Sequence, residues 1–250
     1  MKYYSNLVSL RVFSFGDALK FISNDKSTKS YLSRMCKDGK IRRIKRDLYS
    51  VIDLFTNTDI ASQYNIASHI TDSSFVSYHS AFEFYDFYNQ SYTEIQISSF
   101  TKFNDFEYED YLYHCILTKS DNQIENIQGT RVSSIERTIV DSINMLGKVM
   151  DVEELVKCID FIRYVNYDKI KEMLLVYNKD LLYRKVGYVL SFFKDTLKLP
   201  NEFFDFCKSH SNINNYGFLS HGEIKKLEFI SEWGIYAYKD LLKLVNKGVN

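Results

Sequence analysis

Between residues 27 and 51, apolar positions recur first at the spacing of one helix face and then at the spacing of two short strands. Leu32, Met35 and Cys36 mark the buried face of a helix that is expected to begin at Ser27 or Thr28. Gly39 follows them at a position where helices commonly end. From residue 41 onward the pattern predicts a hairpin whose turn is Lys45-Arg46-Asp47, so a helix leads directly into a basic hairpin.

The polar face of this predicted helix carries short hydrogen-bonding side chains framed by cations. Such a face suits a helix inserted in the major groove of DNA, with the following hairpin as the wing of a winged helix-turn-helix. An ordinary solvated helix face is the alternative, but a basic patch that coincides with this pattern favours DNA. We predict DNA contacts, at base edges from the helix and at phosphates or the minor groove from the hairpin, by Lys29, Ser30, Ser33, Arg34, Lys37, Lys40, Arg42, Arg43, Lys45 and Arg46.

The rest of the pattern predicts an α+β protein. A short helix within residues 2–11 and a helix capped by Ser14 precede the stretch above, and the polar connector 52–58 suggests domains of 1–58 and 59–250. The second domain is expected to be a mixed α/β domain with a small sheet, helical from about residue 134. Its expected helices are 59–70, 134–147, 152–162, 167–177, 181–197, 201–210 and 239–245, and its expected strands are 93–98, 108–118 and a pair within 124–132. The stretch 75–85 is expected to be a short strand that breaks into a helix, and 216–236 is ambiguous.

The formal net charge of the 250 residues is zero, but the charge is unevenly distributed. Residues 1–58 hold 12 cations and 5 acids, a net charge of +7, so the remaining residues carry −7. A basic head joined to an acidic body indicates a DNA-binding module attached to a part that does not bind polyanions.

Four widely separated cysteines form no CxxC pair, which is typical of free thiols in a reducing compartment. The first residues lack the apolar core of a signal peptide, and no apolar run reaches the length of a membrane span. We therefore expect a cytoplasmic protein without a membrane segment.

The candidate catalytic and metal-binding residues favour structural roles. Glu136 and Asp141 are five positions apart, so on a helix they face about 140° apart and do not share a proton or a metal ion. Arg137 and Asp141 are expected to form an i,i+4 pair. Tyr78-His79-Ser80 lacks a nucleophile elbow, and the set Cys207, His210 and His221 lacks a fourth metal ligand. The sequence predicts no catalytic residue, no metal and no cofactor.

Three blocks of sequence carry a resemblance to a known family. They are Lys40–Ser50, Val76–Ala81 and Ser134–Asp141, and they occur in this order at suitable separations. Together they resemble the AbiEi-like antitoxins of abortive-infection operons, over about residues 14–190. Two departures are Asp47, where the family commonly has Gly in the wing turn, and the tail after Pro200, which is hard to align. The motif residues of the second domain are then Tyr78, His79, Ser80, Glu136, Arg137, Thr138 and Asp141.

The resemblance implies a non-enzymatic antitoxin and transcriptional autorepressor of a type IV toxin–antitoxin operon. Its winged helix would bind inverted repeats in double-stranded promoter DNA, as a dimer or as two cooperating copies. Its second domain would counteract a nucleotidyltransferase-like toxin without forming a stable complex. Two alternatives stay open: a DNA-processing enzyme that depends on Glu136, and a plain regulator with a sensing or interaction domain.

Overall fold

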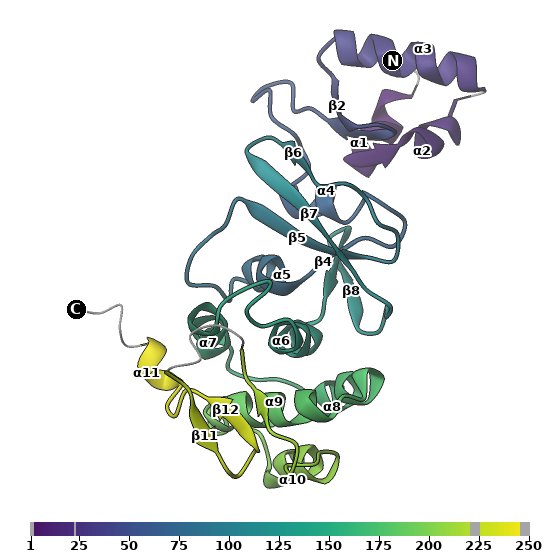
Figure 1. Cartoon of the computed structure of the whole chain (residues 1–250). Helices are drawn as coiled ribbons and strands as arrows, with labels where there is room; N and C mark the ends of the chain where they lie inside the picture. The colour runs from purple at the N-terminus through teal and green to yellow at the C-terminus, as the bar shows by residue number, and fades with distance from the viewer. Residues whose placement is uncertain (1–2, 23, 221–225, 246–250) are drawn as a thin grey trace. The chain divides into compact units, whose positions relative to one another are not determined.

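The computed structural model (Figure 1) describes residues 3–22, 24–220 and 226–245 and has an α+β fold, as expected. Contacts divide the chain into two compact units. The first comprises residues up to 76 with 93–119 and 125–132, and the second comprises 77–92, 120–124 and the chain from 133. This division differs from the predicted boundary at residue 58, because residues 1–58 belong to the same unit as most of a larger sheet.

The N-terminal part of the first unit contains the predicted helix and hairpin. β1, β3 and β2 form an antiparallel sheet in that order, and α3 packs on it through a core that includes Leu32 and Met35. The backbone is left-handed at Gly39 (φ 67°) and at Asp47 (φ 62°) in the hairpin turn. The elements are α1 Tyr4–Leu10, β1 Val12–Ser14, α2 Phe15–Leu19, α3 Asp25–Lys37, β2 Ile41–Lys45 and β3 Leu48–Val51.

The start of α3 was wrongly predicted at Ser27 or Thr28. Asn24 is the cap, because its side chain accepts a hydrogen bond from the backbone N–H of Ser27 at 3.0 Å. Thr28 is instead buried, and its hydroxyl donates to the Asn24 carbonyl at 2.9 Å. The capping box of Ser14 and Asp17 at the start of α2 is confirmed.

A mixed sheet in the order β6-β7-β5-β4-β9-β8 forms most of the rest of the first unit. The strand predicted over 108–118 is confirmed for its larger part, β7, but it starts too early: Tyr108 ends the preceding strand β6, and the chain turns at Glu109 and Asp110, both with positive φ. The helix predicted over 59–70 is short, because Asp59 pairs with Ile52 in a β-bridge and Ser62 caps the helix later. The elements are α4 Gln63–Ala67, β4 Phe75–Val76, β5 Glu94–Ser99, β6 Phe106–Tyr108, β7 Tyr111–Leu117, β8 Ile124–Ile127 and β9 Thr130–Ser133.

The second unit is mainly helical and is built around α6, which contacts α5, α7, α8 and α9. The described residues of the ambiguous stretch 216–236 contribute most of a small sheet in the order β10-β12-β11. Among the described residues, no helix has the length and apolar character that crossing a membrane requires. The elements are α5 Tyr78–Phe84, α6 Ile135–Asn144, α7 Val152–Phe161, α8 Tyr167–Tyr177, α9 Asp180–Ser191, α10 Asn201–Ser209, β10 Gly217–Phe218, β11 Glu228–Ile230, β12 Ile235–Ala237 and α11 Leu242–Val245.

The packing of α9 against the β11–β12 turn gives a test of the second unit. A Cβ on Gly187 would collide with the ring of the buried Trp233. We expect Gly187→Ala to lower the free energy of unfolding by about 1–3 kcal/mol, because overpacking outweighs the better helix propensity of alanine. Urea denaturation measures the change.

Gly16→Ala in α2 is the matched control, since its Cβ would meet only Ser14 Oγ at 3.6 Å. Its stability is expected to stay the same or to rise by up to about 1 kcal/mol. Equal stabilisation by both substitutions would contradict the packing of Trp233 on α9.

Candidate functional site

The predicted DNA-contact face of α3 is a solvent-facing surface of a well-anchored helix. Thr28, Tyr31, Leu32 and Met35 are buried on one side. The opposite side exposes the candidates, and the guanidinium of Arg34 lies 5.5 Å from the centre of the Tyr31 ring. We call this surface the α3 face; it consists of Lys29, Ser30, Ser33, Arg34 and Lys37, all of them exposed.

One cation of the hairpin extends the α3 face. Arg43 of β2 lines a surface hollow together with Lys29, Ser33 and Lys37. Arg43 and Arg46 are exposed, whereas Lys40 is partly buried and lies 3.9 Å from Asp38. The structure therefore groups four of the ten predicted side chains around one hollow, three from α3 and one from β2.

Two other hairpin cations are engaged within the first unit. The Arg42 guanidinium pairs with Glu109 and lies 3.6 Å from Asp59 Oδ2, and the same oxygen accepts a hydrogen bond from the Tyr108 hydroxyl at 2.8 Å. The Lys45 ammonium lies 5.1 Å and 4.9 Å from the centres of two phenylalanine rings, Phe103 and Phe106, and burial lowers its pKa. These two cations attach the hairpin to the loop and strands around β6.

The Arg137 side chain lies at the centre of the motif block on α6 and is completely buried. Its Nε donates to Asp141 Oδ2 at 3.1 Å, and its two terminal nitrogens donate to the backbone carbonyls of Asn122 and Ser120. The other oxygen of Asp141 accepts from the Tyr177 hydroxyl at 2.6 Å. Burial raises the pKa of Asp141, while Arg137 and Tyr177 oppose the rise. The predicted structural i,i+4 pair is confirmed.

The remaining motif residues of α6 also have structural partners. Glu136 Oε1 accepts from the backbone N–H of Asn166 at 2.9 Å, at the residue that caps α8. It therefore does not share a site with Asp141, as predicted from their spacing. The hydroxyl of Thr138 donates to the Ser134 carbonyl at 2.8 Å, and Ser134 caps α6.

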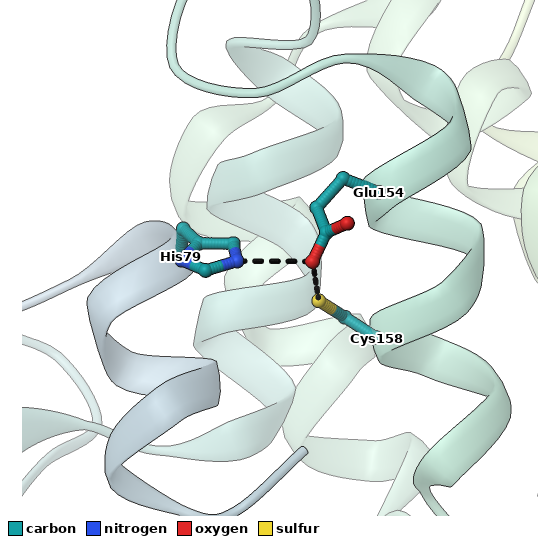
Figure 2. Close-up of side chains that lie close together, drawn as sticks. All are labelled: His79, Glu154 and Cys158. Carbon is teal, nitrogen blue, oxygen red and sulfur yellow. Dashed lines mark hydrogen bonds and ion pairs between the residues drawn. The ribbon is translucent and has the colours of Figure 1, made fainter. Parts of the chain in front are cut away.

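The Tyr78-His79-Ser80 segment begins α5 and is fully buried. Tyr78 has a left-handed backbone (φ 53°), and the imidazole of His79 points toward Glu154 of α7 (Figure 2). His79 Nε2 lies 3.1 Å from Glu154 Oε1, and the same oxygen lies 3.6 Å from the Cys158 sulfur. On its other side, His79 Nδ1 lies 3.4 Å from Glu83 Oε1.

The electrostatics of this cluster, which we call the His79 cluster (His79, Glu83, Glu154 and Cys158), follow from its burial. Burial alone would raise the pKa of Glu154, but hydrogen bonds from His79 and Cys158 hold it below its ordinary value. Burial, reinforced by the Glu154 charge, raises the pKa of the Cys158 thiol. Sequence reasoning missed the cluster because its halves are about 75 residues apart, although each half shows an i,i+4 spacing.

The sequence predicts that Cys207, His210 and His221 do not form a metal site. Of these three, His221 lies outside the described residues. Cys207 is a buried residue of α10. His210 stacks on Tyr183 with ring centres 5.3 Å apart, and its Nδ1 lies 3.0 Å from the Phe206 carbonyl oxygen. Within the described ranges, His79, Glu154 and Cys158 are the group whose atoms lie close enough to share an ion.

Comparison with known proteins adds information about the fold. No protein-family model matches the chain, and none of the curated proteins matches its sequence. Among solved structures, the crystal structure of the RV2827C protein from Mycobacterium tuberculosis is similar, with a TM-score of 0.64 and 9% sequence identity. The similarity covers 98% of this chain and 92% of that chain, so the two share a fold over nearly their whole length.

The Arg137–Asp141 pair generates a stability prediction. Asp141→Asn removes the carboxylate that pairs with the completely buried guanidinium of Arg137. We expect the free energy of unfolding to fall by about 3–5 kcal/mol, the cost of leaving a buried charge uncompensated. Urea unfolding followed by circular dichroism provides the measurement.

Glu153→Gln is the control, because Glu153 and Lys157 form an exposed i,i+4 pair on α7. This substitution is expected to change the free energy of unfolding by less than about 0.5 kcal/mol. Similar small changes in both variants would refute the structural role of Arg137.

Proposed function

We propose that this chain is a DNA-binding transcriptional repressor that acts as the antitoxin of a type IV toxin–antitoxin operon. The α3 face carries the proposal, because it combines short hydroxyl side chains with three cations on one rigid helix. Hydroxyls and an arginine at this spacing suit base edges in the major groove, and lysines suit phosphates. The opposite, buried face fixes the orientation of the helix.

The order of elements around α3 supports the interpretation of this segment as a winged helix-turn-helix. Helices α2 and α3 are joined by a short connection, and the β2–β3 hairpin follows α3 directly. Arg43, beside the α3 face, and Arg46, at the hairpin turn, are exposed and suit phosphate contacts. Arg42 and Lys45 are assigned instead to holding the hairpin in place.

The antitoxin part of the proposal rests on the resemblance of three sequence blocks to AbiEi-like proteins. Under this proposal, the second unit is stabilised by the hydrogen bonds of Arg137, Asp141 and Thr138, and these residues have no catalytic role. The toxin would be nucleotidyltransferase-like and opposed without a stable complex. The promoter DNA would carry inverted repeats that two copies of the chain bind.

The DNA-binding proposal predicts a loss of affinity when the α3 cations are removed. A Lys29→Ala, Arg34→Ala, Lys37→Ala variant should bind duplex DNA from upstream of its own gene about 30- to 1,000-fold more weakly. This range corresponds to a loss of about 2–4 kcal/mol of binding free energy, from one base contact and two phosphate contacts. Fluorescence anisotropy at fixed salt measures it.

A charge-matched control uses Lys119, Lys148 and Arg163, which are exposed and lie away from α3 in the sequence. Replacing these three by alanine should change the affinity by less than about threefold. An equal loss of DNA affinity in both triple variants would indicate non-specific attraction between charges and would contradict the proposal that α3 contacts the DNA.

The antitoxin proposal is tested separately by co-expression with the neighbouring toxin gene. The full chain, expressed from an unrelated promoter, should restore growth. The α3 triple variant should restore growth as well, since neutralisation is assigned to the other part of the chain. Failure of the wild-type chain to restore growth would contradict the antitoxin role while leaving DNA binding intact.

A further inference from the structure

We propose that His79, Glu154 and Cys158 bind one Zn²⁺ ion in the second unit, with Glu83 as a positioning residue for His79. This inference is independent of the proposed DNA-binding function. It starts from the arrangement in Figure 2, where an imidazole nitrogen, a carboxylate oxygen and a thiol converge. The three ligand atoms all lie within 4.8 Å of one another.

Two of the three separations match those of ligands around a tetrahedral zinc ion, and the third, between the His79 ring nitrogen and the Cys158 sulfur, is at most 4.8 Å. With Zn–N and Zn–O bonds of about 2.0–2.1 Å and a Zn–S bond of about 2.3 Å, ligand atoms are about 3.3 Å (N to O) and about 3.6 Å (S to O) apart. The observed distances are 3.1 Å from His79 Nε2 to Glu154 Oε1 and 3.6 Å from that oxygen to the Cys158 sulfur. One tetrahedral position remains, which a water molecule would fill.

Two helices hold the ligands rigidly. Glu154 and Cys158 are four positions apart on α7, so both face α5, which carries His79. The side chain of Asp151 caps α7 by accepting from the Glu154 backbone N–H at 2.8 Å. An ion at this point would therefore link α5 to α7 inside the hydrophobic core of the unit.

Glu83 supplies the outer contact that zinc-bound histidines generally have. Its Oε1 lies 3.4 Å from His79 Nδ1, and the same oxygen accepts from the Tyr92 backbone N–H at 2.7 Å. A carboxylate that accepts a hydrogen bond from Nδ1 would keep the proton there and leave the Nε2 lone pair directed at the ion. The Tyr92 ring packs against the imidazole with centres 4.2 Å apart and restricts its rotation.

The ligand set selects among metal ions. Imidazole and thiolate ligands favour zinc over the hard ions Mg²⁺ and Ca²⁺, which prefer sites built from oxygen alone. Binding requires the Cys158 thiol to lose its proton to solvent as the Zn–S bond forms, and no oxidation or reduction is involved. Without an ion, the same distances are those of hydrogen bonds from His79 and Cys158 to Glu154, and this is the competing account.

The test uses the full chain after metal removal with EDTA. Zinc is added back in slight excess, unbound ion is removed, and the metal content is measured by plasma mass spectrometry. We expect about one zinc ion per wild-type chain and less than about one tenth of that in Cys158→Ser. Cys207→Ser is the matched control, because Cys207 is equally buried in the same unit but outside the cluster. It should retain the zinc.

A second measurement, made on the wild-type chain, does not depend on whether the variants fold. Co²⁺ added to the wild-type chain should give the intense visible absorption of a tetrahedral centre and a thiolate-to-cobalt band in the near ultraviolet. Glu83→Gln should keep both signals but weaken Zn²⁺ affinity by about 10- to 100-fold. Absence of both retained zinc and cobalt absorption in the wild-type chain would overturn the proposal, as would equal loss in Cys207→Ser.

Discussion

The constraint on which the second unit depends is the burial of the Arg137 guanidinium. A charged side chain without solvent contact is tolerated only when a counter-charge and hydrogen-bond acceptors surround it. Arg137 obtains these from Asp141 and from the carbonyls of Ser120 and Asn122, and Asp141 in turn accepts from Tyr177 of α8. This network fixes α6 against a loop and a second helix. Because α5 and α7 pack on α6, it also fixes the helices that carry the His79 cluster.

The basic charge of the first 58 residues overstates the surface available to DNA. Arg42 is paired with acids and Lys45 is covered by two aromatic rings, so these cations stabilise the hairpin instead of projecting from it. The proposed interface therefore includes fewer cations than residues 1–58 contain. It centres on the α3 face, with Arg43 beside it. Position and exposure, more than net charge, define the proposed contact surface.

Local sequence signals predicted local structure well. α8 was predicted with its observed ends, the β2–β3 hairpin follows from its apolar spacing, and the Arg137–Asp141 pair follows from i,i+4 geometry. The predictions were wrong where contacts with other parts of the chain, or the local backbone conformation, determine where an element begins. The helix expected from residue 59 is shortened by a bridge to Ile52, and the strand expected over 108–118 begins only after a turn at two positive-φ residues, Glu109 and Asp110. The His79 cluster was invisible for the same reason, since His79 meets Glu154 only after α5 packs near α7.

The central claim is that α3, and not the whole basic segment, contacts DNA. The most direct measurement is the slope of log affinity against log salt concentration for the full chain on its upstream duplex. A Lys29→Ala, Lys37→Ala variant should reduce the magnitude of this slope by about two, one for each lost phosphate contact. An Arg42→Ala, Lys45→Ala variant that remains folded should keep the wild-type slope. The opposite pattern, or a wild-type affinity that does not depend on salt, would contradict the account.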